Sequence, residues 1–203
     1  IKMVVGLLAA DRGKIVVNGR DLAADPLGAK RSIGFVPDNP NLYPRLTGLG
    51  YLNLIGDVYG VDGATRKRRL DYYLQMFELT SAVGDLIQSY SRGMQQKLAL
   101  TGALLHQPPL FILDEPMVGL DPRSAHLFKR VMQEHVNQGN TVFFSTHILE
   151  VAENLCHRVG IINKGQLIAC GTMDELRQAS GQAGSNLEKL FLELTDAGGI
   201  DED

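Results

Sequence analysis

Two adjacent carboxylates follow a short apolar run near the middle of the chain, in residues 110–116 (LFILDEP). The apolar residues predict a buried strand, and open parallel sheets bind ligands at the carboxyl ends of their strands. Successive strand residues point to opposite faces, so Asp114 and Glu115 are expected to have different roles. One carboxylate can hold Mg²⁺ through water while the other orients or deprotonates an attacking water. The alternative is a strand end whose acids only cap the next turn.

A second candidate site lies in residues 88–97 (QSYSRGMQQK), ahead of an apolar helix that ends near Leu105. Ser91 is well placed to cap this helix. The exposed backbone amides of a first helical turn also make a ready site for an anion. Capping without any ligand is the simpler interpretation of this segment taken alone.

Short apolar runs alternate with helical patterns from Leu110 onward, which predicts an α/β protein with a parallel sheet. The runs 110–113, 142–144 and 159–162 are expected to be strands covered on both faces. Residues 122–138 between the first two predict a helix, because apolar residues recur at offsets of three and four. These positions are Leu127, Phe128, Val131, Met132 and His135.

The rest of the chain predicts further helices and strands. Residues 47–80 carry two helical patterns without an intervening strand, which indicates a helical insertion. Residues 32–36 predict the strand that precedes it, and residues 166–170 a hairpin partner for the last strand. Residues 187–194 form an amphipathic pattern before an acidic tail.

Composition excludes several classes of protein. With 203 residues, 44% of them hydrophobic and 21% charged, the chain is of the ordinary globular type. Its net charge of -3 disfavours a nucleic-acid partner. The longest apolar run, residues 3–10, is far shorter than the roughly 20 residues that cross a bilayer and is expected to be a buried helix. Cys156 and Cys170 indicate reduced thiols in a cytosolic protein.

Five segments, taken in chain order, resemble the motifs of the ATP-binding subunits of ABC transporters. The resemblance extends from Ile1 to about Thr195. The matching segments are 35–38 (FVPD) for the Q-loop, 91–95 (SRGMQ) for the signature L-S-G-G-Q, 110–115 (LFILDE) for Walker B and the catalytic glutamate, 119–122 (GLDP) for the D-loop and 145–147 (STH) for the switch histidine.

This resemblance implies an α/β fold with a P-loop NTPase-like, mostly parallel sheet core and a helical insertion subdomain. It implies a single domain over residues 1–203. Residues 1–46 and 107–180 would form the α/β core, and residues 47–106 the helical subdomain with the signature motif. Residues 181–203 would add a C-terminal helix and the acidic tail.

The resemblance also implies roles for individual residues around MgATP, where phosphoryl transfer requires mainly positioning and charge stabilisation. Asp114 would hold the water shell of Mg²⁺, Glu115 would be the general base, and His147 would contact the terminal phosphate. Asp121 would link the two sites of a head-to-tail dimer. The remaining nucleotide-binding positions would be Ser91, Arg92, Gly93, Met94 and Asp38, of which Asp38 would also be a metal ligand.

The chain departs from the family pattern at the phosphate-binding loop. G-x-x-x-x-G-K-[ST] does not occur, and the pair Gly13-Lys14 is followed by Ile15. The opening Ile1-Lys2-Met3 resembles the helix that follows this loop in the family, so we expect a truncation just after the loop. The loop provides most phosphate contacts, so the chain as given is expected to bind ATP poorly and to be inactive.

Two further departures lie in the other motifs. Asp38 replaces the Q-loop glutamine, which keeps an oxygen ligand but adds negative charge beside a triphosphate. Arg92 and Met94 replace signature residues, and the cation of Arg92 is expected to offset Asp38 in part. The pattern Y-S-x-G-M resembles an exporter branch whose membrane subunit is a separate six-helix chain.

Other polar and apolar segments are weaker candidates. Residues 66–69 (RKRR) are expected to be a solvated face or docking surface, with a nucleic-acid or lipid patch as the alternative. Apolar residues near 42–46 are candidates for contact with a membrane partner. The histidines lack the spacing of metal ligands, so no metal other than magnesium is expected. These are His106, His126, His135 and His157.

The expected function is therefore an ATPase subunit that uses ATP and Mg²⁺ to drive export through a transmembrane permease. It would act as a homodimer or heterodimer of ATPase subunits, in the cytoplasm and peripheral on the inner face of the plasma membrane. The alternatives are a non-transport ABC protein acting on ribosomes or DNA, and a catalytically silent subunit.

Overall fold

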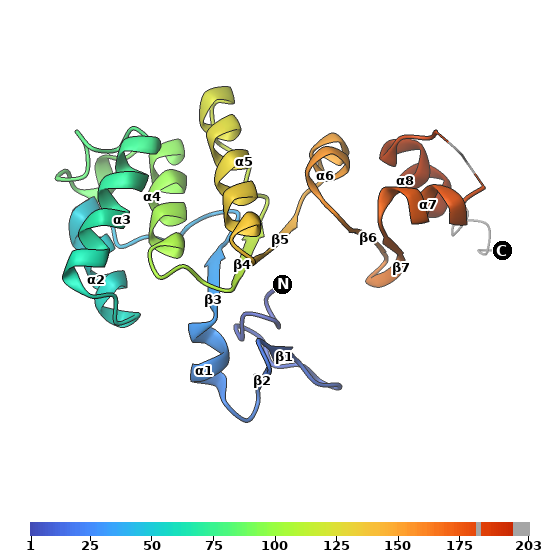
Figure 1. Ribbon diagram of the computed structural model, residues 1–203, viewed down its shortest axis with the longest axis horizontal. Coiled ribbons are helices and arrows are strands. Elements are labelled where there is room, and N and C mark those ends of the chain that lie inside the picture. Colours follow the sequence, from blue (N-terminus) through green and yellow to red (C-terminus); the bar gives the residue numbers. More distant parts are fainter. Residues whose placement is uncertain (182–183, 197–203) are drawn as a thin grey trace. The chain divides into compact units, whose positions relative to one another are not determined.

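The computed structural model describes residues 1–181 and 184–196. The chain divides into two compact units, residues 1–145 and residues 146–203. Figure 1 labels the helices and strands of both units. Among the described residues, no helix is both long enough and apolar enough to span a membrane.

A three-stranded parallel sheet forms the centre of the first unit (Figure 1). Its strands are β3 (Ile33–Val36), β4 (Leu110–Asp114) and β5 (Thr141–Ser145), in the order β3-β4-β5. Val36 is paired with Leu113, and Asp114 with Ser145, so the three carboxyl ends lie in register. The predicted α/β fold and parallel sheet are confirmed.

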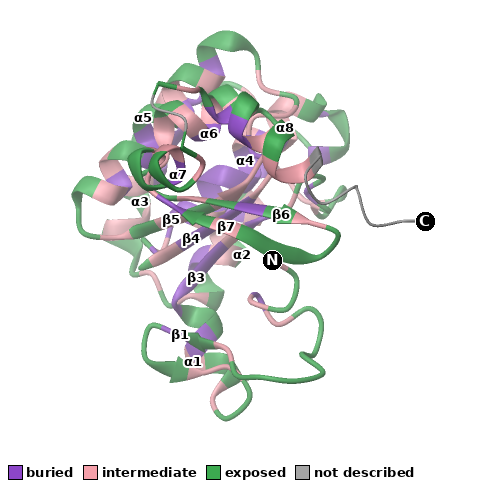
Figure 2. Ribbon diagram, turned by 90° about the vertical axis from the view of Figure 1, so that its right-hand side faces the viewer, coloured by how far each residue is buried: buried purple, intermediate pink, exposed green. Residues whose placement is uncertain are grey.

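The predicted burial of the strands is correct for β4 and wrong for β5. Phe111, Ile112 and Leu113 of β4 are fully buried, and Figure 2 shows this burial along β3 and β4. In contrast, Phe143 of β5, which is at the edge of the three-stranded sheet, is 52% exposed. An apolar run thus identified a strand but not how its faces are covered.

Helices α2 (Gly48–Val58), α3 (Gly63–Met76) and α4 (Arg92–Leu104) confirm the predicted helical insertion. A short 3-10 helix, η1 (Ile87–Ser89), precedes α4. Each α-helix begins at a polar cap whose side chain accepts a backbone N–H. Thr47 accepts from Gly50, Asp62 from Thr65, and Ser91 from Met94.

The helical insertion is joined to the sheet by close contacts around the end of α4. Gly34 of β3 lies against this segment, where an added Cβ would be 2.7 Å from the carbonyl oxygen of Ala103. The Tyr59 ring stacks on His106 with ring centroids 3.6 Å apart. The His106 Nε2 lies 3.2 Å from the Ile33 carbonyl oxygen. These contacts connect α2, the end of α4 and β3.

Helix α5 (Pro122–Asn137) packs against β5, contacts β4 through Phe128, and confirms the helix predicted between β4 and β5. The ring of Phe128 meets Phe111 edge to face, with centroids 6.4 Å apart. His135 near the helix end is buried, and its Nε2 lies 2.9 Å from the Pro108 carbonyl oxygen.

The N-terminal segment corrects the prediction of a buried helix over residues 3–10. A single helical turn ends at Gly6, whose φ is +70°. The Gly6 and Leu7 amides donate to the carbonyls of Met3 and Lys2, which closes the turn as a helix C-cap. Leu7 and Leu8 are exposed and only Val5 is buried. The helix expected from the apolar run therefore ends at the glycine, which permits the left-handed backbone.

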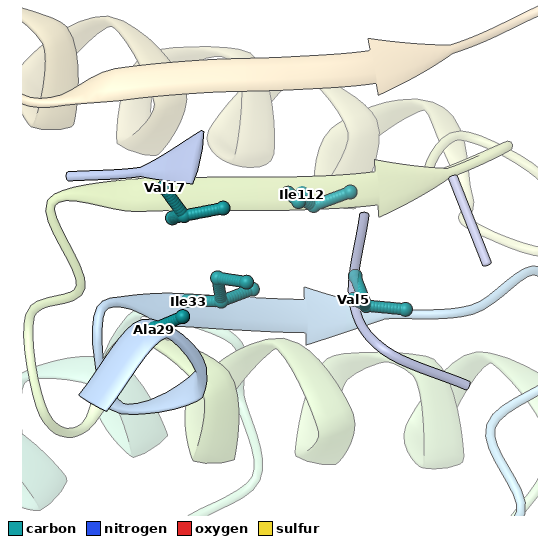
Figure 3. Close-up of a cluster of buried hydrophobic side chains, with 5 residues drawn as sticks. All are labelled: Val5, Val17, Ala29, Ile33 and Ile112. Atoms are coloured by element: carbon teal, nitrogen blue, oxygen red, sulfur yellow. The ribbon is translucent and has the colours of Figure 1, made fainter. Parts of the chain in front are cut away.

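Val5 belongs to a small hydrophobic cluster beside the sheet, with Val17, Ala29, Ile33 and Ile112 (Figure 3). The remaining elements of this region are the antiparallel pair β1 (Val16–Val17) and β2 (Arg20–Asp21), followed by α1 (Pro26–Arg31). Asp25 caps α1 through the Gly28 amide.

The second unit has its own core. It contains α6 (Leu149–Leu155), the antiparallel hairpin β6 (Val159–Asn163) and β7 (Gln166–Gly171), then α7 (Met173–Ala179) and α8 (Leu187–Asp196). The predicted hairpin and C-terminal helix are confirmed, whereas β6 is not covered on both faces, since Ile162 is 66% exposed. The acidic tail lies outside the described residues. The buried cluster comprises Ala152, Ile161, Leu176, Leu187 and Leu190.

Candidate functional site

The carboxyl ends of the three parallel strands gather polar residues from three separate parts of the sequence. Asp38 follows β3, Asp114 ends β4, and Ser145 ends β5 in register with Asp114. Parallel strands place these ends at one edge of the sheet, where open α/β sheets bind their ligands.

Asp114 is held by a residue for which the sequence predicted no role. The Ser145 hydroxyl donates a hydrogen bond of 2.5 Å to Asp114 Oδ1. This contact fixes one carboxylate oxygen at the sheet edge and leaves the other for a further ligand. Ser145 opens the segment matched to the switch histidine, but the sequence predicted no role for it, and its register with Asp114 comes from the structure.

Glu115 lies just beyond the strand in a left-handed backbone conformation, with φ +48°. Its amide donates to the Ser145 carbonyl oxygen at 3.1 Å, and its carbonyl accepts from the Val118 amide at 3.1 Å. Such a conformation costs roughly 1–3 kcal/mol for a non-glycine residue and occurs preferentially at functional sites. The two acids therefore differ in backbone conformation because the chain turns at Glu115. The sequence had predicted a difference from strand pleating instead.

The signature segment forms the start of α4. The Ser91 hydroxyl accepts from the Met94 amide at 3.2 Å, as capping predicted. Ser91 and Arg92 are exposed, and Met94 is half-buried. A Cβ on Gly93 would lie 3.0 Å from the Gly119 carbonyl oxygen, so glycine allows α4 to approach the loop after Glu115 closely.

The two substituted motif positions, Asp38 and Arg92, lie next to each other. Arg92 Nη2 is 3.7 Å from Asp38 Oδ1. The aliphatic part of Arg92 runs along Gly119, where an added Cβ would be 3.6 Å from Cγ and Cδ of the arginine. One side chain thus connects the Asp38 loop, the start of α4 and the loop after β4.

Asp121 caps α5 and also connects it to α4. It accepts a 2.9 Å hydrogen bond from the Ser124 amide and a second from the Ser124 hydroxyl. Lys97 Nζ lies 3.5 Å from Asp121 Oδ2. The hydroxyl and amide of Ser124, together with Lys97, hold the pKa of Asp121 well below its ordinary value of 3.8. Sequence reasoning missed Lys97 and Ser124; the serine three residues after the cap was an available signal.

His147 belongs to the second unit, two residues after β5. It is exposed, and the neighbouring Thr146 hydroxyl accepts from the Ile148 amide at 3.1 Å. The first unit therefore brings together Asp38, the signature turn, the strand-end acids and Asp121. His147 lies outside this unit and follows β5 by two residues in the chain.

The donor atoms at the sheet edge fit magnesium. Asp114 and Asp38 offer carboxylate oxygens, the hard ligands that this ion prefers. Within residues 1–181 and 184–196, no group of three or more His, Cys, Asp or Glu is arranged to hold a metal. Magnesium commonly uses one or two carboxylates and completes its coordination with water and phosphate oxygens, so this sparse set is of the right kind.

Comparison with known proteins identifies the family. Residues 1–118 match the family model described as ABC transporter. The ABC-type transporter ATP-binding protein EcsA of Bacillus subtilis is 36% identical over 200 residues, which cover 98% of this chain and 81% of EcsA. The chain belongs to the ATP-binding proteins of ABC transporters, a family of ATPases, as the motif resemblance predicted.

Solved structures agree in fold. The structure of an ATP-binding subunit of an ABC transporter superposes with a TM-score of 0.93 at 37% identity, covering 95% of this chain and 80% of the other. The ATP-binding cassette MJ0796, a dimer in a post-hydrolysis state bound to ADP and Pi, superposes with a TM-score of 0.75 at 26% identity. That match covers 85% of this chain and 78% of MJ0796.

Proposed function

We propose that this chain is the ATP-hydrolysing subunit of an ABC exporter, which couples MgATP binding and hydrolysis to substrate movement through a separate membrane subunit. The observation that carries the proposal is the pair of acids at the end of β4. Asp114 is fixed by Ser145, and Glu115 is placed in a strained turn immediately after it. A purely structural strand end needs neither feature.

The two acids are assigned separate roles. Asp114 uses the oxygen not engaged by Ser145 to hold a water of the hydrated ion. Glu115 is the general base that takes a proton from the attacking water. Magnesium, when bound, neutralises charge that develops on the phosphates. His147 contacts the terminal phosphate in this proposal.

The start of α4 is assigned to the nucleotide of a second subunit in a head-to-tail dimer. Ser91, Arg92, Gly93 and Met94 present the first turn of a 13-residue helix, whose amides favour an anion. Asp121 links the two sites through its contacts with Lys97 and Ser124. Asp38 is a metal ligand whose charge Arg92 offsets within the same chain.

The helical subdomain is proposed to contact the transmembrane subunit at the cytoplasmic face of the plasma membrane. Leu54 and Val58 of α2 are 40% and 63% exposed, and Tyr43 ahead of the helix is 58% exposed. In the predicted contact segment 42–46, Leu42 and Leu46 are only half-exposed. The exposed apolar side chains of α2 therefore extend the surface that the sequence suggested.

The 203 residues by themselves are proposed to bind ATP weakly. The motif G-x-x-x-x-G-K-[ST] is absent from the sequence, and its backbone amides and lysine provide most phosphate contacts in P-loop proteins. The export direction is supported by the Tyr90-Ser91-x-Gly93-Met94 pattern.

The test is ATP hydrolysis by a fused chain in which a family phosphate-binding loop with its strand precedes Ile1. We expect magnesium-dependent hydrolysis that falls about 10²–10⁴-fold in Glu115→Gln while ATP binding remains. Glu188→Gln, an acid on α8, should leave the rate unchanged. Absence of hydrolysis in the folded fused chain would favour a catalytically silent subunit.

Purification from cells distinguishes transport from the other classes. A membrane protein that co-purifies with the chain supports the proposed function. Co-purification with ribosomes or DNA would instead indicate a non-transport ABC protein.

A further inference from the structure

A cavity of about 280 Å³ lies between α3, α5 and the segment that follows α4. The helices that border it are labelled in Figure 1. None of the residues assigned above to ATP, magnesium or the dimer lines it. Its polar lining includes Arg68, Arg69, Tyr72, Gln107, Glu134 and His135.

Arg69 is held in place by neutral acceptors. Its Nη1 donates to the Leu105 carbonyl oxygen at 2.7 Å, and its Nη2 donates to the Gln107 side-chain oxygen. These bonds orient the guanidinium at the cavity without neutralising its charge with a carboxylate. A guanidinium oriented in this way loses little entropy when an anion binds.

Arg68 adds a second cation from the neighbouring position of α3. It is exposed, and within residues 1–181 and 184–196 it forms no ion pair. The nearby Arg66 differs, because it is paired with Asp57 at 2.6 Å. Of the three arginines in the basic run 66–69, Arg66 is therefore paired with a carboxylate, whereas Arg68 and Arg69 line the cavity.

The carboxylate of the cavity is already engaged. The Tyr72 hydroxyl donates to Glu134 Oε2 at 2.9 Å, and Arg130 Nη2 lies 3.7 Å from Glu134 Oε1. Burial and this hydrogen bond raise the pKa of Tyr72 to about 12, so the hydroxyl remains a donor at neutral pH. Burial lowers the pKa of His135, which favours its neutral form. Within the described part of the chain, the charges of Arg68 and Arg69 have no carboxylate partner.

We propose that this cavity binds a phosphate monoester through Arg68 and Arg69. A monoester carries a charge of about −1.5 to −2 at neutral pH, which matches two guanidinium groups, and its oxygens suit the forked donors of arginine. The volume is close to the lower end of about 300 Å³ for small-molecule sites, so the ligand is small. Bound there, it bridges α3 and α5 and strengthens the joint between the helical insertion and the sheet.

Calorimetric titration of the 203-residue chain with glycerol 3-phosphate tests the proposal. We expect saturable binding that weakens at least tenfold in Arg68→Gln. Lys67→Gln is the matched control, because it removes the same charge from the same helix at a position that does not line the cavity. Circular dichroism checks that both variants remain folded. Glycerol, which lacks the phosphate, should not bind.

A flotation assay with phosphatidic acid vesicles distinguishes a soluble ester from a lipid headgroup. Binding of glycerol 3-phosphate alone assigns the site to a soluble ester, whereas vesicle binding that Arg68→Gln abolishes assigns it to a headgroup. Equal weakening by Lys67→Gln and Arg68→Gln, or no binding of either probe, would overturn the proposal. None of these outcomes depends on ATP hydrolysis.

Discussion

At the scale of single residues, the candidate site depends on pairs that are far apart in the sequence. Asp114 is oriented by Ser145 and Asp121 is linked to Lys97, although neither partner is close to it in the chain. Asp38 and Arg92, both departures from the family motifs, lie 3.7 Å apart. We propose that the two substitutions compensate each other, because their charges are opposite and each would otherwise alter the charge near the triphosphate of the proposed function.

A double-mutant cycle measures the coupling between Asp38 and Arg92. We expect Asp38→Asn and Arg92→Gln to show an interaction of about 0.2–1 kcal/mol in urea unfolding, the range for exposed ion pairs. The coupling should decrease in 1 M salt because screening weakens the attraction. A cycle of Arg92→Gln with Asp11→Asn, an exposed acid elsewhere in the first unit, should show none. A salt-independent coupling would contradict an ionic contact.

At the scale of elements, the helical insertion is joined to the sheet by the segment that connects α4 to β4. His106 stacks on Tyr59 and its Nε2 contacts the Ile33 carbonyl oxygen, so one side chain touches both the end of α2 and β3. Arg69 of α3 binds the Leu105 carbonyl oxygen of the same segment. We therefore expect the orientation of the insertion to respond to substitutions in residues 105–107.

Acidification should weaken this joint through His106. Burial lowers its pKa from 6.5 to about 4, so between these values the unfolded chain takes up a proton that the folded chain does not. The contribution of neutral His106 to the free energy of unfolding should be fully present above pH 6.5. It should fall by on the order of 1–3 kcal/mol as the pH decreases to 4.

The measurement is unfolding in urea between pH 7 and pH 4. His106→Gln should reduce the dependence of the free energy of unfolding on pH in this window. The pH dependence that remains should include the contribution of buried His135, whose pKa is also lowered. His126→Gln, at an exposed position of α5, should leave the profile of the unsubstituted chain unchanged. Identical profiles for the chain and His106→Gln would contradict the assignment.

Gly34 should be intolerant of a side chain. An added Cβ would lie 2.6 Å from Pro108 Cγ and 2.7 Å from the Ala103 carbonyl oxygen, so Gly34→Ala should cost about 1–3 kcal/mol in thermal or urea unfolding. Gly63→Ala is the contrasting change, because nothing lies within 4 Å of its added Cβ and it is in a helix. That variant should be neutral or more stable by up to about 1 kcal/mol. Equal destabilisation by the two changes would argue against the packing explanation.

At the scale of the whole molecule, two compact units have separate hydrophobic clusters. The first unit contains the sheet, the helical insertion and the candidate site except His147. The second contains a cluster centred on Leu187 and Leu190, both buried. Because each cluster is made within its own unit, the stability of one should be separable from that of the other.

Leu190→Ala tests this separation by hydrogen exchange. The cavity left by the leucine should destabilise the second unit by about 2–5 kcal/mol, with faster exchange in α6, α8 and the β6–β7 hairpin. Amides of β4 should keep their protection. Leu192→Ala, at a 51% exposed position of the same helix, is the matched control and should have a small effect. Equal acceleration in β4 and α8 after Leu190→Ala would show that the units unfold together.

The sequence alone determined the features that depend on local chemistry. Helical periods predicted α2, α3 and α5, and apolar runs predicted α4 and the parallel strands. Ser91 was identified as a cap because capping involves residues only three apart. The order and spacing of the motifs predicted the family, which the comparisons confirmed. The failed helix over residues 3–10 shows that a continuous apolar run does not by itself predict a helix, since the single glycine Gly6 ended it.

Only the tertiary structure decided which distant residues meet. The register of β4 with β5 places Ser145 on Asp114, and the close approach of α4 to the Gly119 loop brings Arg92 to Asp38. Phe143 of β5 is exposed although its strand is apolar, and α3 and α5 both line the cavity that contains Arg68 and Arg69. Register, edge position and helix packing arise from the whole core, so no local pattern in the sequence specifies them.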